Sequence, residues 1–160
     1  MMKKQFTRPH LEALGFQGFQ SVRDLRLARC VPLPMDGGVY LVLRTSETPP
    51  TFSTTGTGGW FKGKDPNVSL VELRAKWLPD VPLLYVGKAT GLRERVDQLL
   101  RFGAGSRVGH WGGRYLWQVK GSEDFLVTWK RSKTPRATEA SLILEFVNLH
   151  SKLPFANLIG

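Results

Sequence analysis

Two short apolar runs and two amphipathic patterns dominate the chain. Residues 38–43 (GVYLVL) and 83–86 (LLYV) are rich in β-branched and aromatic side chains, which predicts two buried strands. From Leu92 onward, apolar positions recur at the spacing of one helical face. The Thr-Pro pair at 134–135 is typical of a helix start, and the helix it opens is expected to extend to about His150.

Two weaker patterns complete the expected elements. Ser69, with Glu72 three positions later, has the spacing of a capping box, which predicts a short helix over 69–78. Residues 115–119 and 125–129 carry aromatic and β-branched positions on either side of a polar turn, as paired strands do. Leaving the short helix aside, the expected order is strand, strand, helix, strand, strand, helix.

This order is typical of an α/β or α+β domain with a small sheet, three-stranded or slightly larger, mixed or antiparallel, flanked by helices. A chain of 160 residues suits one compact domain better than two. We assign residues 1–35 to an N-terminal extension packed on the domain and 36–160 to the domain itself. An insertion at about 45–80 separates the first two strands, and residues 45–67 have the Thr, Ser, Pro and Gly content of a surface loop.

The charge balance points to a polyanionic partner. Twenty-three Lys and Arg against thirteen Asp and Glu give a formal charge of +10, which favours nucleic acid. No apolar run approaches the length of a membrane span, so we expect no membrane association. A single cysteine, Cys30, excludes an internal disulfide and indicates a reducing, cytoplasmic compartment, with Cys30 itself a small buried apolar residue.

Three features shared by the strands and the first long helix form a recognisable pattern. The first strand opens with GVY (38–40), the second ends in YVG (85–87), and the following helix carries Arg95. Together these residues resemble the two motifs and the helix arginine of the GIY-YIG nuclease superfamily. The run from Tyr85 to Arg95, YVGKATGLRER, is most similar to that of the bacterial excision-repair members.

The C-terminal part of the chain carries a second portion of the same pattern. In the family a later helix supplies a metal-binding glutamate, often as LLLE, followed by a proline and an asparagine. Here LILE (142–145) is followed by Pro154 and Asn157 at the family's spacings. The resemblance covers residues 38–43 and 83–160.

The resemblance implies an endonuclease that hydrolyses phosphodiester bonds with Mg²⁺ or Mn²⁺, on double-stranded or branched DNA. In that reading Glu145 binds the metal, Arg95 steadies the phosphate, and Tyr40 or Tyr85 orients or deprotonates the water. A tyrosine acting as a base needs a lowered pKa, and Lys88 or the metal would provide it. The catalytic residues implied are Tyr40, Tyr85, Lys88, Arg95, Glu145 and Asn157.

The identity of the acidic ligand also follows from the residues themselves. Glu145 is bracketed by apolar positions on its helix, and a buried carboxylate is costly unless it is paired or bound to a metal. A salt bridge would satisfy it as well. Glu139 is the competitor; it lies near the start of the same helix, where the helix dipole explains an acid, and a different helix register would exchange the two roles.

One departure from the family concerns the second acid or base. Many members have His or Tyr four residues after the helix arginine, whereas this chain has Leu99, an ordinary core residue. His110, in the segment VGHWGGR, could fill that role from another direction, or it could be a hydrogen-bonded loop histidine. The missing residue makes a rival function credible: a nucleic-acid-binding module of the same fold that cleaves weakly or not at all.

Basic and aromatic residues interleave at two places, as they do where proteins stack on bases and hold phosphates. The first is Trp60 and Phe61 with their neighbouring lysines, which could equally be a loop tucked over the sheet. The second surrounds Trp111. The expected nucleic-acid contacts are Lys62, Lys64, Arg93, Arg107, Trp111 and Arg114.

Overall fold

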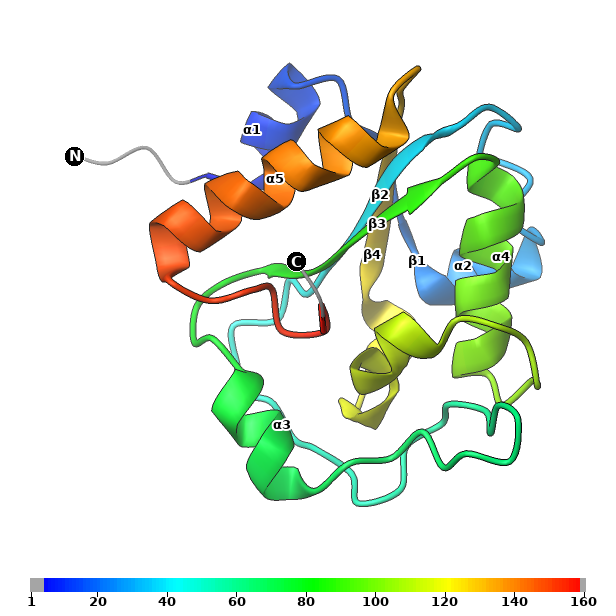
Figure 1. Cartoon of the computed structure of the whole chain (residues 1–160), viewed down its shortest axis with the longest axis vertical. Coiled ribbons are helices and arrows are strands. Elements are labelled where there is room, and N and C mark those ends of the chain that lie inside the picture. The colour runs from blue at the N-terminus through cyan, green and yellow to red at the C-terminus, as the bar shows by residue number, and fades with distance from the viewer. Residues whose placement is uncertain (1–4, 159–160) are drawn as a thin grey trace.

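The computed structural model describes residues 5–158, which form a four-stranded antiparallel sheet with helices packed on both of its faces (Figure 1). The strands lie in the order β1, β4, β2, β3. This arrangement confirms an α+β fold with a small sheet. The bounds are β1 Gln17–Ser21, β2 Gly38–Leu43, β3 Leu83–Ala89 and β4 Leu126–Arg131.

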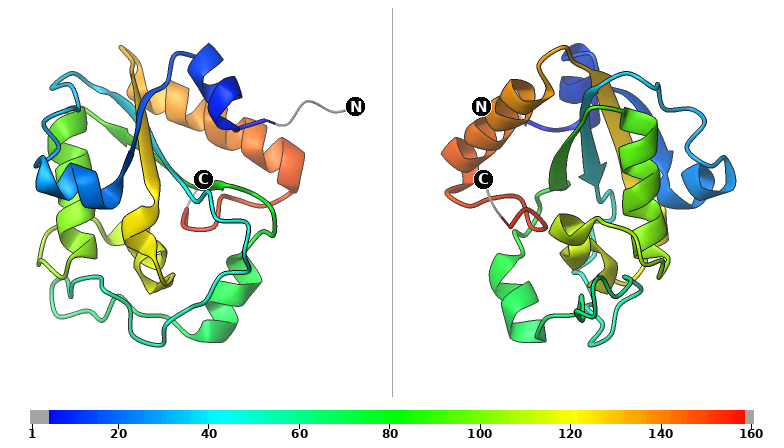
Figure 2. Two further views of the ribbon diagram at one scale, coloured as in Figure 1. Left: turned by 180° about the vertical axis from the view of Figure 1, so that it is seen from behind. Right: turned by 45° about the vertical axis from the view of Figure 1, so that its right-hand side comes forward.

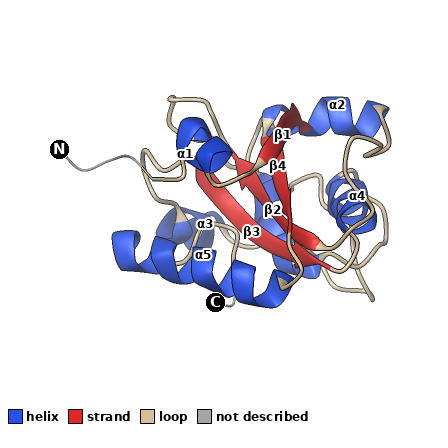
Figure 3. Cartoon of the chain, turned by 90° about the horizontal axis from the view of Figure 1, so that it is seen from above, coloured by secondary structure: helices blue, strands red, loops and turns tan. Residues whose placement is uncertain are grey.

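Five α-helices surround this sheet in the described part of the chain. Figure 3 shows α1 and α5 on one side of the sheet and α2 and α4 on the other. The short helix α3 lies beyond one end of the sheet, where Figure 1 shows it away from both layers. Their bounds are α1 Arg8–Ala13, α2 Val22–Leu27, α3 Leu70–Lys76, α4 Leu92–Gly103 and α5 Pro135–His150.

The central strand β2 is buried along its whole length because both of its faces are covered. Tyr40 and Val42 belong to the core that α2 and α4 cover. Val39, Leu41 and Leu43 belong to the core under α1 and α5. Successive side chains of a strand point to opposite faces of the sheet. The sheet therefore separates two hydrophobic cores, one on each face.

The helices expected from periodicity and caps are present. The side chain of Ser69 accepts a hydrogen bond from the Glu72 amide at 3.2 Å and caps α3, as the capping-box spacing predicts. Helix α4 buries an apolar stripe that includes Leu92, Val96 and Leu99. Helix α5 begins at Pro135, as predicted, and Cys30 is buried with 1% of its surface exposed.

One predicted strand is wrong. Residues 115–119 do not form a strand; most of them lie in a 3₁₀ helix, η1 Trp111–Gln118. Tyr115, Leu116 and Trp117 are consecutive and all buried, whereas a half-exposed strand would expose every second side chain. The tight turn packs Trp117 against Gly103, where an added Cβ would lie 2.3 Å from the indole.

The N-terminal segment is more than an extension packed on the domain. Strand β1 pairs antiparallel with β4 and so forms one edge of the sheet, and α1 covers the same face as α5. A register shift between Gly18 and Gln20 interrupts the alternation of side chains in β1. Residues 1–4 of the predicted extension lie outside the described part of the chain.

Residues 44–82 connect β2 to β3 by a long excursion rather than a tight turn. Figure 2 shows this segment running around one end of the molecule, with α3 as its single helix. Apart from α3 it contains isolated bridges at Phe52 and between Phe61 and Lys64, so the predicted surface loop is largely confirmed. Among residues 5–158, no helix has the length and apolarity needed to cross a lipid bilayer.

Candidate active site

The register of β2 and β3 brings the two motif tyrosines together. Tyr40 lies opposite Gly87, and Val42 lies opposite Tyr85, so the two phenols are diagonal neighbours on one face of the sheet. Their ring centroids are 6.1 Å apart, with 40° between the ring planes. The motifs GVY and YVG are therefore one cross-strand unit.

The glycines of both motifs are required by packing. A Cβ added at Gly87 would lie 2.3 Å from the ring of Tyr40, so this ring occupies the space that a side chain at 87 would fill. A Cβ at Gly38 would lie 2.1 Å from the carbonyl oxygen of Lys130 on β4. Both positions exclude any larger residue, and the Gly87 position also fixes where the Tyr40 hydroxyl points.

His110 reaches the tyrosine pair from the loop that precedes η1. Its Nε2 lies 2.6 Å from the Tyr40 hydroxyl oxygen, and its ring packs edge-on against both Tyr40 and Tyr85. The side chain is fully buried, and within residues 5–158 its Nδ1 has no hydrogen-bond partner. A Cβ at Gly113 would lie 3.2 Å from Nδ1, so this glycine makes room for the imidazole.

Burial keeps the three groups neutral. It lowers the pKa of His110 to about 3, with the nearby charge of Arg95 acting in the same direction. Burial raises the pKa of Tyr40 well above its ordinary value, and the charged form of Tyr85 raises it further. When the imidazole proton sits on Nδ1, the Tyr40 hydroxyl donates its hydrogen bond to Nε2.

Tyr85 is the phenol nearer to the surface. It is 8% exposed, compared with 1% for Tyr40. A Cβ at Gly112 would lie 3.8 Å from its hydroxyl oxygen, so this hydroxyl sits under the loop that opens η1. Burial raises the pKa of Tyr85 to about 12, against the opposing effect of Arg95. Tyr85 is therefore more accessible to solvent than Tyr40 and His110.

Arg95 is held at the rim of this cluster by α4. One guanidinium nitrogen donates to the Gly109 carbonyl at 2.7 Å and to the Gln98 side chain at 2.9 Å. Its charge acts on the pKa of His110 and of both tyrosines. The side chain is partly exposed, and its other nitrogens make no hydrogen bond within the described residues.

Lys88 does not lie where the motif suggested. It pairs with Val39 across the strands and so faces α5, on the side of the sheet opposite the phenol rings. There its ammonium forms an ion pair with Glu139 at 3.3 Å. The expectation that Lys88 lowers the pKa of a tyrosine is not met, because burial raises both tyrosine pKa values.

Glu139 is the acid whose charge acts on the two tyrosines. Strand β3 lies at the edge of the sheet, so groups on its two faces can meet around that edge. The carboxylate of Glu139 contributes to raising the pKa of Tyr40 and of Tyr85. Its side chain is 18% exposed, which leaves it reachable from solvent.

Glu145, the expected metal ligand, lies elsewhere on α5. The inward stripe of this helix contains Glu139, Ile143 and Phe146 at i, i+4 and i+7, and Glu145 falls off it. Within residues 5–158 Glu145 makes no hydrogen bond or ion pair. The prediction treated the helix as buried on most sides, but Leu144 and Leu149 are 61% and 42% exposed.

Asn157 supports β3 instead of facing the cluster. Its side-chain amide donates to the Val86 carbonyl and accepts from the Val86 amide, each at 2.9 Å. Asn157 is 6% exposed, and both ends of its amide are used by these bonds. Asn157 therefore makes the two backbone hydrogen bonds that a further strand would otherwise make with β3, at the residue next to Tyr85.

Two phenols, an imidazole and a guanidinium thus gather on the α4 side of the sheet, and the Lys88–Glu139 ion pair lies on the α5 side of β3. No protein-family model, curated protein or solved structure matches this chain. The chemistry has to be inferred from the groups themselves.

The expected nucleic-acid contacts divide into three sets. The first set is exposed and includes Lys62, whose ammonium lies 5.3 Å from the Phe61 ring centroid. Phe61 packs beside Gly109, whose carbonyl accepts the hydrogen bond from Arg95. Arg114 stacks on Trp111 at 4.5 Å, and both are partly buried. Arg93 donates to two backbone carbonyls of the N-terminal segment. The exposed cations are Lys62, Lys64 and Arg107.

The sequence indicates His110 only as an alternative acid or base. The segment VGHWGGR has no helical or strand periodicity, so its position relative to the strands cannot be predicted. The signal that could have found it is the pair of glycines on its C-terminal side. Gly112 and Gly113 leave the space in which the Tyr85 hydroxyl and the imidazole sit.

The acidic groups suit only a sparse metal site. Within residues 5–158, no three His, Cys, Asp or Glu side chains converge on a preformed cage. Mg²⁺ in phosphate chemistry is commonly held by one or two carboxylates, with waters and substrate oxygens completing the shell. Glu139 could be the single carboxylate ligand of such a site, and Lys88 would have to leave its ion pair with Glu139.

Proposed function

We propose that the protein is a metal-dependent endonuclease that hydrolyses phosphodiester bonds in nucleic acid, with DNA as the substrate. The observation that carries the proposal is the buried Tyr40–His110 hydrogen bond directly behind Tyr85 and beside Arg95. Hydrolysis of a phosphodiester needs cationic stabilisation of the developing phosphorane and a group that takes a proton from water. The net charge of +10 supports a polyanionic substrate.

Arg95 is the proposed phosphate-binding group, since its unbonded nitrogens lie at the rim of the cluster. The Tyr85 hydroxyl, just below the surface, would orient the attacking water or the phosphate by a hydrogen bond. Both groups are fixed by packing before a substrate arrives, which is the condition for electrostatic stabilisation of a transition state.

The Tyr40–His110 pair would move the proton. Tyr85, whose hydroxyl is the one nearer to the surface, would take a proton from water and pass its own to Tyr40, whose hydroxyl proton moves to Nε2 of His110, so no free phenolate has to form. The charge of Arg95 helps to lower the pKa of His110, and a bound phosphate anion would offset that charge. Substrate binding would therefore make the imidazole a better base at the moment it is needed.

Glu139 is the proposed ligand for Mg²⁺ or Mn²⁺. This carboxylate would hold the ion, which would supply positive charge for the developing phosphorane. Metal binding at Glu139 would have to displace the Lys88 ammonium from its ion pair with this carboxylate.

A plasmid-nicking assay in Mg²⁺ and in Mn²⁺ tests the proposal. Arg95→Ala and Tyr85→Phe should each reduce the rate by about 10²-fold or more, the loss typical for a preorganised transition-state donor. Glu139→Gln should abolish the response to the metal, whereas Glu145→Gln, an acid of the same helix outside the cluster, serves as the matched control and should cleave like wild type.

Two results would overturn the assignment. Equal activity of the Glu139→Gln and Glu145→Gln variants would remove Glu139 from the site. Failure of the wild type to cleave supercoiled, nicked, branched or single-stranded DNA, with DNA binding intact, would favour the alternative function, a binding module of the same fold. The protonated, deeply buried state of Tyr40 is the observation that keeps this alternative open.

A further inference from the structure

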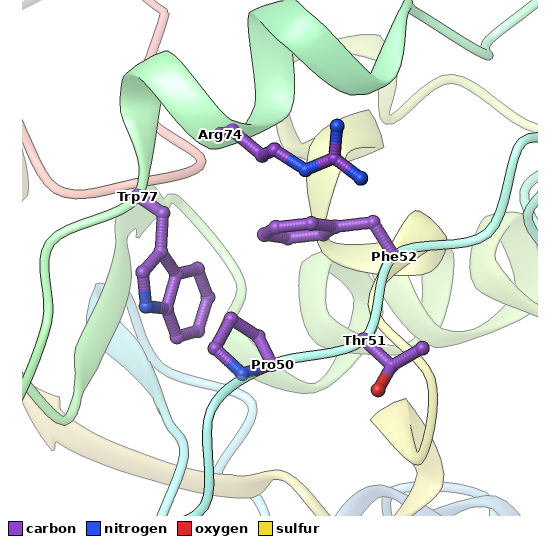
Figure 4. A pocket seen from close by; sticks show the side chains of 5 residues that line it. All are labelled: Pro50, Thr51, Phe52, Arg74 and Trp77. Carbon is purple, nitrogen blue, oxygen red and sulfur yellow. The ribbon is translucent and has the colours of Figure 1, made fainter.

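A second concave site lies within the insertion, between its first part and the C-terminal end of α3, and shares no residue with the tyrosine cluster. It has a volume of about 340 Å³, and Figure 4 shows its lining side chains coming from residues 50–52 and from α3 and the residue that follows it. Such a volume is at the low end for small-molecule sites, which span about 300–1,000 Å³. It suits one planar ring better than an extended ligand. The lining residues are Pro50, Thr51, Phe52, Arg74 and Trp77.

The walls of this α3 pocket are aromatic, and its one charge is positive. The rings of Phe52 and Trp77 stand nearly perpendicular, with centroids 5.6 Å apart and 75° between their planes. In Figure 4 the guanidinium of Arg74 extends from α3 above the Phe52 ring, with Pro50 on the opposite side. Phe52 and Trp77 are both only partly buried, so they can accept a stacked ligand.

The pocket is rigid because its walls are tied to the core. The Lys120 amide donates to the Thr51 carbonyl at 2.9 Å, and the neighbouring Ser53 amide donates to the Gln118 carbonyl at 2.8 Å. Behind the walls, the buried Phe155 stacks on Phe52 at 5.9 Å and meets Trp77 at 5.0 Å. A ligand would therefore bind without first having to order the site.

Charge around the α3 pocket favours an anionic ligand. The guanidinium of Arg44 lies 5.4 Å from the Trp77 ring centroid, beside the pocket. Lys152 reaches the same end of α3, where its ammonium donates to the Ala75 carbonyl. Grooves lined by aromatic residues also accept proline-rich peptides. The surrounding cations match a nucleotide strand better, because its phosphates can contact them while its base stacks.

The C-terminal segment connects this pocket to the tyrosine cluster. Phe155 forms the back of the pocket, the amide of Ala156 donates to the Leu84 carbonyl at 2.8 Å, and Asn157 holds Val86. The segment that packs behind the pocket is therefore also bonded to β3, the strand that carries Tyr85.

We propose that the α3 pocket binds one unpaired nucleobase of the strand whose phosphodiester lies at the tyrosine cluster. The base would stack on Phe52 and Trp77, with Arg74 above it. A base inside a duplex is stacked and paired, so this site selects single-stranded, frayed or branched regions. The inference rests on the proposed function for its ligand class but does not require cleavage.

Fluorescence anisotropy with a labelled oligothymidylate and with a duplex of equal charge, in EDTA, tests the pocket without cleavage. Trp77→Leu removes a stacking wall, and Arg74→Ala, at an exposed position, tests the pocket without disturbing the core. Each should weaken single-strand binding by about 5- to 150-fold, the usual effect of losing one stacked base. Arg101→Ala, an exposed helix arginine on α4, is the charge-matched control and should weaken both ligands alike by much less.

The outcomes separate this proposal from the proposed function. If both pocket variants bind the oligothymidylate as the control does, the pocket assignment is wrong, even when the wild type nicks DNA. If the wild type binds neither nucleic acid, both proposals are wrong. A proline-rich peptide that binds the wild type but not Trp77→Leu, with oligothymidylate binding unchanged in that variant, would assign the pocket to a peptide instead.

Discussion

Asn157→Ala would remove the amide that pairs with both backbone groups of Val86 on the outer edge of β3. These groups point away from β2, and the structure satisfies them with two bonds of 2.9 Å from a residue that is 6% exposed. Leaving a buried backbone donor or acceptor unpaired costs about 1–3 kcal/mol each. Two such groups, with some relief from water at the sheet edge, predict a loss of about 2–4 kcal/mol.

Urea unfolding measures this loss directly, with Asn148→Ala as the control because that asparagine is exposed on α5. Asn157→Asp sharpens the test. Its carboxylate can accept from the Val86 amide but cannot donate to the carbonyl, whereas the protonated acid can donate. The destabilisation by Asn157→Asp should therefore shrink as the pH falls below its pKa. A difference of less than about 0.5 kcal/mol between the two alanine variants, the scatter of ordinary surface substitutions, would refute the structural role.

Three further outcomes are expected. His110 has a pKa of about 3 in the folded state, below its ordinary 6.5, so the unfolded chain binds the extra proton. Stability should be complete above pH 6.5 and fall by about 1.4 kcal/mol per unit as the pH drops toward 3, and His110→Gln, measured by denaturant titration, should lose this component. Gly87→Ala drives a methyl group into the Tyr40 ring and should destabilise by about 1–3 kcal/mol or more, whereas Gly91→Ala, with its nearest contact at 3.5 Å, should be tolerated; equal unfolding midpoints would contradict this packing. DNA affinity should weaken steeply between about 50 and 200 mM salt, and a flat response would argue against phosphate contacts.

The elements that could be predicted are those specified by local pattern. Strand β2 and helix α5 match their expected bounds because an unbroken apolar run and a Thr-Pro start are contained within each segment. Strand β1 escaped prediction because Gly18 and its bulge interrupt the alternation, and Gly18 is there to admit the ring of Trp129, more than a hundred residues away.

In the candidate site, too, some features follow from local sequence pattern and others depend on tertiary packing. The tyrosine pair follows from motifs that fix their own register, whereas the acid depends on how α5 is rotated against the sheet. Glu139 and Glu145 are about one and two-thirds turns apart. The inward side of α5 is shown only by which apolar residues the fold buries, Ile143 and Phe146, and which it exposes, Leu144. His110 depends on a non-periodic segment, so its bond to Tyr40 is set by tertiary packing alone.

The long connection between β2 and β3 has a consequence for how the molecule assembles. A tight hairpin would select the strand alignment as soon as it formed, but residues 44–82 impose no alignment of their own. The fit of Tyr40 over Gly87 must therefore choose among registers after the chain has closed a large loop. Pairing between such distant segments is slow. Strand β4 has to find β2 and β1 across still longer stretches of chain, so every pairing in this sheet is long-range, and we expect the sheet and the tyrosine cluster on it to form late in folding.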